Sequence, residues 1–311
     1  MKKSFLLTLL AVATLLTAAY GMQAKPRYAN NAQRIIAEIH NPKSKYVVVA
    51  AHRGDWRNYP ENSIGAIESV IRMGVDIVEI DLKLTKDSVL VLSHDRTCNR
   101  MTTGKGDISK MTFDSLATFN LRTAHNVRLP GTRITTFREA LEVCKDRIVI
   151  NVDQGYKYYD LVVKMTDELG MSDQILIKGS KPRDVVAKDM EGSKMMYMPI
   201  INILQDKGKK LFQEYEGWHK QTGEAPLAYE LCFNELTPEV EECCKNIVGQ
   251  GSKLWVNTLW PSLCGGYNDD RALDEDIDEV YGKILSLGTS MIQTDRPEML
   301  IKWLEKKGRR K

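Results

Sequence analysis

The sequence predicts an α/β fold, a (β/α)₈ barrel formed by a single domain over residues 45–305. Two observations predict it. Short apolar runs rich in strand-forming residues alternate with segments of helical period, which favours a parallel sheet with helices on its faces. The alternation continues for about 250 residues, the length that eight strand–helix units need, and no linker or internal repeat divides it.

Nine apolar runs are candidates for the eight strands. They lie at residues 46–51, 76–84, 89–93, 147–153, 174–178, 194–198, 227–231, 253–258 and 289–293. Only a short turn around Lys86 to Ser88 separates the second run from the third, which is too short for a parallel crossover. One of these two runs is therefore expected to bend or to lie outside the regular barrel.

Most connections between these runs have the spacing of an amphipathic helix. The first has one apolar face, with Ile64, Ile67 and Ile71. Asn62 or Ser63 is suited to begin this helix and Gly74 to end it. Further helices are predicted at residues 137–145, 158–169, 182–190, 238–247, 273–287 and 297–305.

One long connection, residues 96–135, shows no clear apolar period and is rich in polar residues and glycine. We call this segment the excursion. We expect it to cover the active face of the barrel, with Leu116 and Leu121 packed beneath it.

The N-terminus has the features of a secretory signal peptide, predicted to comprise residues 1–24. Lys2 and Lys3 precede a largely apolar run over residues 5–19, and cleavage is expected near residues 21–24. The run is short for a membrane span, so we expect an exported protein, periplasmic or secreted, with no stable membrane anchor. An uncleaved anchor is the alternative.

Composition limits the partners further. Removal of the signal peptide leaves 42 basic and 41 acidic residues, a net charge of about +1. Bulk charge therefore indicates no nucleic acid or membrane surface as a partner. Export would permit disulfides, but the six cysteines form no metal-binding pattern. We expect mostly buried free thiols, with room for one bridge.

The run at residues 76–84 places Glu79 and Asp81 on one face. An antiparallel strand with a wet polar face would explain this alternation. In a barrel both faces of a strand are covered, so two adjacent carboxylates need a cation or a shared proton. A divalent metal with oxygen ligands, Ca²⁺ or Mg²⁺, is the simplest solution. Asp153 is the natural third ligand, unless it caps the following helix.

Two histidines follow directly after apolar runs, His52 and His94. A lone histidine is usually a satisfied polar residue, but two at strand ends beside paired acids indicate a general acid and a general base. Arg53 offers a planar fork of donors to a phosphate or a carboxylate. An ion pair of Arg53 with Glu61 or Asp55 is an equally good explanation.

Two other strand ends carry candidate binding residues. Lys178 ends a run where its charge can face an anionic substrate, and a surface lysine is the alternative. Trp255 and Trp260 bracket another strand end, where they can wall a pocket. Core packing is the simpler explanation for at least one of the two tryptophans.

These motifs resemble those of the glycerophosphodiester phosphodiesterase family over most of the mature chain. In order along the chain, the matching motifs are His52-Arg53-Gly54, Pro60-Glu61-Asn62-Ser63, Glu79-x-Asp81, His94-Asp95, residues 99–106, residues 134–140, Asp153 and Thr294-Asp295-Arg296-Pro297. Their order, spacing and strand placement all agree with the family.

The resemblance implies a TIM barrel that needs one divalent metal ion and cleaves a small-molecule phosphodiester. It implies glycerol 3-phosphate and an alcohol as products, formed through a cyclic phosphate that water opens. The residues that it implies are Glu79, Asp81 and Asp153 for the metal, His52 and His94 as the acid/base pair, Arg53 for the phosphate and Glu61 in support.

Two positions depart from the family pattern. The third metal ligand is usually glutamate, and Asp153 is one methylene shorter. Two residues later the family usually has lysine, and this chain has Gly155, so Lys157 or Lys178 is left to supply that charge. The substrate preference of the family is therefore not transferred to this chain.

Two other functions stay open. A lipid-directed phosphodiesterase of the phospholipase-D type, from the same superfamily, would need an apolar rim, and the excursion has no strong aromatic cluster. A non-catalytic barrel that captures phosphorylated ligands would be favoured by the loss of a histidine or an acid, and none of these is lost. The sequence does not specify the oligomeric state.

Overall fold

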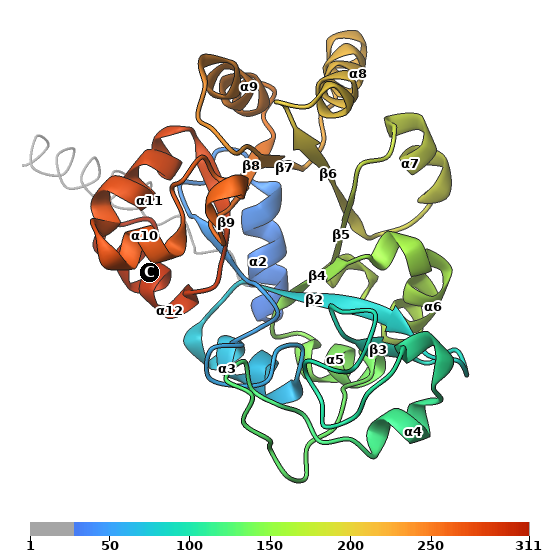
Figure 1. Ribbon diagram of the computed structural model, residues 1–311. Helices are drawn as coiled ribbons and strands as arrows, with labels where there is room; N and C mark the ends of the chain where they lie inside the picture. Colours follow the sequence, from blue (N-terminus) through green and yellow to red (C-terminus); the bar gives the residue numbers. More distant parts are fainter. Residues whose placement is uncertain (1–27, 311) are drawn as a thin grey trace, which may run out of the picture.

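Eight parallel strands close into a barrel in the computed structural model, which describes residues 28–310 (Figure 1). The strands are β1 (Val48–Ala51), β2 (Ile77–Leu84), β4 (Val149–Asp153), β5 (Ile175–Gly179), β6 (Met196–Asn202), β7 (Ala228–Cys232), β8 (Lys253–Asn257) and β9 (Thr289–Thr294). The barrel closes because β1 pairs with both β2 and β9. The predicted fold class is confirmed. The predicted signal peptide lies outside the described residues.

The ninth run forms β3 (Leu90–Leu92), which pairs antiparallel with the end of β2. Leu82 lies opposite Leu92, and Leu84 opposite Leu90. The prediction that one run lies outside the regular barrel is confirmed, because the short turn before β3 permits only a hairpin.

Helices surround the strands (Figure 1). They are α3 (Ile64–Met73), α5 (Phe137–Cys144), α6 (Tyr159–Leu169), α7 (Arg183–Asp189), α8 (Asp206–Thr222), α9 (Pro238–Gly249), α10 (Asp269–Asp274), α11 (Ile277–Ser286) and α12 (Pro297–Lys306), with 3-10 turns η2 (Gly155–Tyr158), η3 (Ser172–Gln174) and η4 (Pro261–Leu263). Ser63 caps α3 by accepting a hydrogen bond from the Ala66 N–H, and Gly74 ends the helix at φ 80°.

The single helix predicted at residues 273–287 is wrong. The segment divides into α10 and α11, because the Asp276 side chain accepts from two backbone N–H groups and starts a new helix there. Three further α-helices were not predicted: α2 (Asn31–His40), the short α4 (Phe113–Ala117) and α8.

Helix α2 covers the end of the barrel from which the parallel strands begin. Its Ile35 and Ile39 pack against inward-facing residues of the strands, among them Val48 and Val149. This contact fills the lower half of the barrel with apolar side chains. Most polar groups inside the barrel therefore lie toward the opposite, carboxyl-terminal end.

The excursion has a small core of its own and contains η1 (Ile108–Lys110) and α4 (Phe113–Ala117). Its Leu116 and Leu121 are buried, as predicted. All six cysteines are buried and free, without the one bridge that export would permit. Among residues 28–310, no helix is long and apolar enough to cross a membrane.

Candidate active site

The inward face of the strands changes from apolar to polar along the chain direction. On six strands an apolar residue is followed two positions later by a polar one: Ile77 and Glu79, Val149 and Asn151, Leu176 and Lys178, Ala228 and Glu230, Trp255 and Asn257, Met291 and Gln293. Side chains two apart share a face of a strand. The polar members therefore form a layer above the apolar core, which is the floor of the candidate site.

Three carboxylates meet on this floor. One oxygen from each of Glu79, Asp81 and Asp153 lies within 4.8 Å of the other two. Asp81 lies opposite Asp153 in the pairing of β2 with β4, so the sheet register brings them together. Asn62 fixes Asp81 twice, since its Nδ2 donates to Oδ2 (2.8 Å) and its Oδ1 accepts from the backbone N–H (3.0 Å).

This donor set fits a divalent metal ion. Burial, together with the charge of Asp81, raises the pKa of Glu79 well above its ordinary value. The two buried cations beside the cluster are each shared with another acid, Arg53 with Glu61 and Lys178 with Glu230. The cluster therefore keeps an excess of negative charge, and its oxygen ligands suit Ca²⁺ or Mg²⁺.

Arg53 joins the carboxylate cluster to a second acidic group. Its backbone N–H donates to Glu79 (2.8 Å), and its guanidinium lies within ion-pair distance of Asp81 (3.4 Å) and Glu61 (3.3 Å). The ion pair with Glu61 that the sequence left open is thus present, whereas Asp55 binds other partners. Within the described residues, the buried Arg53 Nε has no hydrogen-bond acceptor.

Glu61 is held as a carboxylate by two arginines. Arg100 donates to both of its oxygens, at 2.7 and 2.8 Å. Burial alone would raise the pKa of Glu61, but the hydrogen bonds from Arg100 and the charge of Arg53 outweigh burial and lower it. Glu61 is therefore a fixed anion that orients both guanidinium groups.

His94 lies at the rim of the site, with 45% of its side chain exposed. Its Nδ1 lies 2.9 Å from Asp95 Oδ1, and Arg100 donates to both oxygens of Asp95. Hydrogen bonds from Arg100 lower the pKa of Asp95 to about 2. A continuous chain of polar contacts therefore runs from His94 through Arg100 and Glu61 to Arg53.

His52 is the buried histidine of the site. Its Nδ1 lies 2.9 Å from Asp295 Oδ1, and the Trp56 indole donates to the same oxygen (2.6 Å). A carboxylate accepts hydrogen bonds, so in the neutral imidazole Nδ1 carries the hydrogen and Nε2 has the lone pair. The Trp260 ring packs edge-on against the imidazole, with the ring centroids 5.8 Å apart.

A cavity of about 620 Å³ opens beside these groups. His52, Arg53 and Trp260 line it, together with Arg100 and Asn126 of the excursion. The excursion thus contributes to this side of the site, as the sequence predicts. The volume is in the range of small-molecule sites in proteins.

The structure separates the alternatives for two predicted binding residues. Trp255 does not wall the cavity: its side chain is fully buried inside the barrel, and its Nε1 donates to Asn257. The tryptophan at the cavity is Trp260, which is 43% exposed. Lys178 is no surface lysine, since only 7% of its side chain is exposed. Burial would lower its pKa, but the charges of neighbouring acids raise it.

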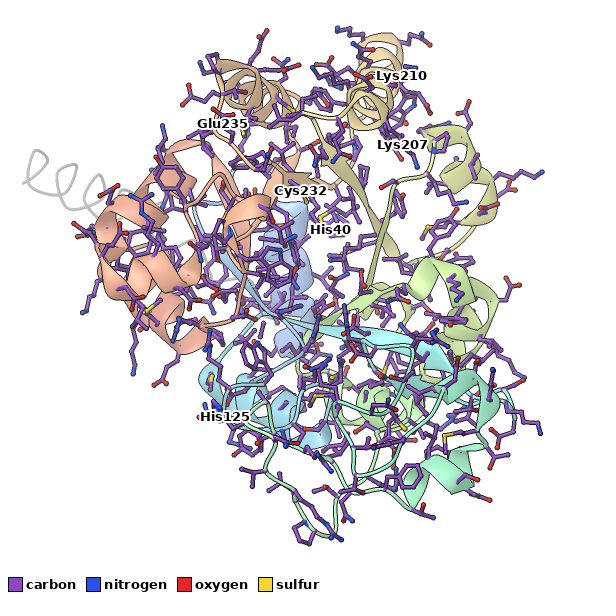
Figure 2. The ribbon with its side chains drawn as sticks, viewed as in Figure 1. His40, His125, Lys207, Lys210, Cys232 and Glu235 are labelled. Atoms are coloured by element: carbon purple, nitrogen blue, oxygen red, sulfur yellow. The ribbon has the colours of Figure 1, made fainter. Side chains whose placement is uncertain are left out.

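Sequence reasoning assigned no role to several residues that the structure brings into the site. Arg100 and Asp295 stand in the matching motifs, and Trp56 lies between two of them, so proximity in sequence was a usable signal. Glu230 interrupts an otherwise apolar strand, which is also a signal. The remaining histidines lie elsewhere: His40 at the end of α2 and His125 on the excursion (Figure 2), and His219 on α8.

Comparison with known proteins gives two family matches. Residues 52–211 match the model described as the glycerophosphoryl diester phosphodiesterase family. Residues 197–304 match a second model, described as a domain of unknown function.

Two named relatives illustrate the range of similarity. A glycerophosphodiester phosphodiesterase of Caldanaerobacter subterraneus subsp. tengcongensis is 29% identical over 269 residues, which cover 84% of this chain and 99% of that protein. Glycerophosphodiester phosphodiesterase 1 of Rattus norvegicus is 37% identical over 109 residues, 34% of this chain and 33% of that protein.

Solved structures share the fold. A glycerophosphoryl diester phosphodiesterase from Parabacteroides distasonis aligns with a TM-score of 0.70 and 23% identity, over 89% of this chain and 92% of that chain. An Oleispira antarctica phosphodiesterase, solved with the product sn-glycerol-3-phosphate, aligns with a TM-score of 0.60 and 17% identity, over 83% and 96%.

Proposed function

The chain belongs to the glycerophosphoryl diester phosphodiesterase family, and on that premise we propose that it hydrolyses glycerophosphodiesters to glycerol 3-phosphate and an alcohol. One observation carries the proposal. Three clustered carboxylates, a partly buried arginine and an oriented histidine converge at the carboxyl-terminal end of a barrel, where the arginine and the histidine line a cavity of suitable size. Active sites of such barrels form at this end.

Glu79, Asp81 and Asp153 would hold one divalent ion, Ca²⁺ or Mg²⁺. When bound, the ion would neutralise phosphate charge and stabilise the charge that develops in the transition state. Asp153 is the most exposed of the three ligands, with 30% of its side chain accessible. The ligand set is therefore open on the Asp153 side, where a phosphate oxygen can approach.

Arg53 is suited to bind the phosphate itself. Its Nε lies 3.4 Å from Asp81 Oδ2 and makes no hydrogen bond among the described residues, so the guanidinium keeps a donor for a phosphate oxygen. Glu61 and Asp81 fix the guanidinium plane from two sides. A planar donor group held in this way binds a phosphate without further loss of side-chain freedom.

His52 and His94 would act as the acid/base pair. Because Asp295 keeps the hydrogen on Nδ1, the Nε2 atom of His52 is ready to accept a proton from the attacking glycerol hydroxyl. His94 would then protonate the leaving alcohol, and a cyclic phosphate would form. Water would open this ring with the two histidines in exchanged roles, which regenerates both protonation states.

We also propose that the protein is exported and acts in the periplasm or outside the cell. The basic residues and apolar run of the N-terminus support this proposal. Mass spectrometry of the protein from its native host tests it. A mature N-terminus within residues 21–25 is expected, and an intact Met1 would contradict export by cleavage.

The activity is tested by glycerol 3-phosphate release from glycerophosphocholine and glycerophosphoethanolamine, with the mature protein and with or without Ca²⁺ or Mg²⁺. We expect metal-dependent release that the His52→Ala variant lacks. Absence of release with either metal would overturn the proposal. Release only from lipid vesicles would favour the lipid-directed phosphodiesterase, and phosphate-ligand binding without turnover would favour the binding barrel.

A further inference from the structure

Lys178 and Glu230 form a buried ion pair inside the barrel. Lys178 Nζ lies 3.1 Å from Glu230 Oε2 and 3.8 Å from Asp153 Oδ1. Only 7% of the Lys178 side chain and 5% of the Glu230 side chain are exposed. The ammonium therefore lies between two acids, one of the carboxylate cluster and one outside it, and it is closer to the acid outside the cluster.

Glu230 is anchored from the side away from the cluster. Its Oε1 accepts a hydrogen bond from Asn257 Nδ2 (2.8 Å), and Asn257 Oδ1 accepts from Trp255 Nε1 (2.7 Å). Cys232, which ends the same strand near the centre of the barrel (Figure 2), lies 3.7 Å away through its sulfur. These contacts come from β7 and β8, whereas Lys178 is on β5. These contacts hold the Glu230 carboxylate in place independently of Lys178.

Without Glu230, the Lys178 ammonium could move onto Asp153. Asp153 is already within 4 Å of Nζ, and the cluster to which it belongs has an excess of negative charge. In a site of low dielectric constant, a lysine that moved onto Asp153 would compete directly with a divalent ion. The Glu230 carboxylate reduces that competition, because it holds Nζ at 3.1 Å from itself and leaves it 3.8 Å from Asp153.

We propose that Glu230 is a positioning residue that keeps the Lys178 ammonium off the metal-ligand carboxylates and presents it to the substrate phosphate, an inference that rests on the proposed function. The two residues have opposite effects on binding of the metal ion. Glu230 favours the metal by restraining Lys178. Lys178 favours the phosphate anion and, as a nearby positive charge, weakens the metal.

A purely structural ion pair makes a different prediction. Breaking a buried pair from either side leaves an uncompensated charge and destabilises the fold. Glu230→Gln and Lys178→Met would then loosen the site in the same direction, and both would weaken metal binding. The positioning role instead predicts opposite signs for the two variants.

Calorimetric titration with Ca²⁺ and with Mg²⁺ distinguishes these cases. Glu230→Gln is expected to weaken metal affinity by about tenfold, and Lys178→Met to strengthen it by about threefold or more. The double variant is expected to resemble Lys178→Met, because Glu230 acts through Lys178. Lys188→Met, which removes an exposed lysine of α7, is the matched control and is expected to change affinity by less than about twofold.

A second titration measures inorganic phosphate binding at saturating metal. Lys178→Met is expected to weaken it by about tenfold, with little change for Lys188→Met. Circular dichroism and thermal unfolding establish that each variant is folded. The inference would be overturned if both single variants change metal affinity in the same direction, or if neither changes it. In that case, turnover by the wild-type protein would still support the proposed function. A wild-type protein that neither binds metal nor releases glycerol 3-phosphate would overturn both.

Discussion

His52 and Asp295 are separated by 243 positions in the sequence, yet His52 Nδ1 lies 2.9 Å from Asp295 Oδ1. The barrel brings them together, because β1 leads into His52, β9 leads into Asp295, and the two strands pair to close the sheet. The contact determines which nitrogen of the imidazole holds the hydrogen. The ability of His52 to act as a base therefore depends on a residue at the other end of the chain.

Asp295→Asn is expected to lower kcat by about 100-fold or more with little change in KM, because an amide can donate to Nδ1 and stabilise the wrong tautomer. Steady-state kinetics across pH measure the effect. Asp270→Asn is the matched control: Asp270 lies on the same cavity, but 58% of its side chain is exposed. Equal losses in the two variants would show that Asp295 acts only through the charge of the cavity.

Metal removal is expected to abolish activity and to lower stability together, since the ion binds only the folded carboxylate cluster. At a concentration one hundred times the Kd, the ion adds about 2.7 kcal/mol to the free energy of unfolding. Urea unfolding with Ca²⁺, with Mg²⁺ and with a chelator measures this increment.

Asp81→Asn is expected to lose the increment, while Asp184→Asn, which changes an acid that is 91% exposed, keeps it. If the metal stabilises Asp81→Asn as strongly as the wild type, the ion binds elsewhere and Glu79, Asp81 and Asp153 are not its ligands.

Strand periodicity made the carboxylate cluster predictable. Glu79 and Asp81 alternate with apolar residues over a long run, so their shared face is a local property of the sequence. Asp153 ends another run, and parallel strands end on the same side of a barrel. The sequence did not provide the register of β2 with β4, which places Asp81 opposite Asp153 and completes the cluster.

The roles of the two tryptophans were not predictable in the same way. All five residues of β8 are buried, so alternation along the strand does not tell which of its two faces points into the barrel. The contacts of Glu230 with Lys178 and Asn257 are likewise non-local. Helix α8 escaped prediction because it is mostly polar and buries only Leu211, Phe212 and Tyr215.

Substitution of Trp260 is expected to lower activity, whereas substitution of Trp255 is expected to lower stability. Trp260→Ala should lower kcat/KM by about tenfold with little loss of stability, because the ring is partly exposed and borders the cavity. Trp255→Phe should keep kcat/KM within about threefold but cost about 1–2 kcal/mol of stability, through lost volume and the lost hydrogen bond to Asn257.

Urea unfolding and substrate kinetics on both variants test this pair. A large loss of kcat/KM in a stable Trp255→Phe protein would show that Trp255 contributes to substrate binding although it is completely buried.

Asp269 is expected to make the stability of the barrel depend on pH. This buried carboxylate accepts hydrogen bonds from the Thr258, Tyr281 and Thr294 hydroxyls and from the Asp295 backbone N–H. Burial, with the nearby charge of Asp295, raises the pKa of Asp269 to about 6 from an ordinary 3.8. Between these values the folded state binds the proton more tightly than the unfolded state. The stability that Asp269 contributes is therefore complete at low pH and is lost as pH rises through 6.

Asp269→Asn has no such proton, so its stability deficit relative to the wild type should depend on pH. The deficit is expected to shrink by about 2 kcal/mol between pH 4.5 and pH 7.5, the linkage energy of a pKa shift of this size. Urea unfolding at both pH values, in the presence of a chelator to exclude metal effects, measures it. Asp270→Asn, at the exposed neighbouring position, is expected to show no such change. A deficit for Asp269→Asn that stays constant with pH would mean that Asp269 is ionised throughout, stabilised by its four donors against the effect of burial.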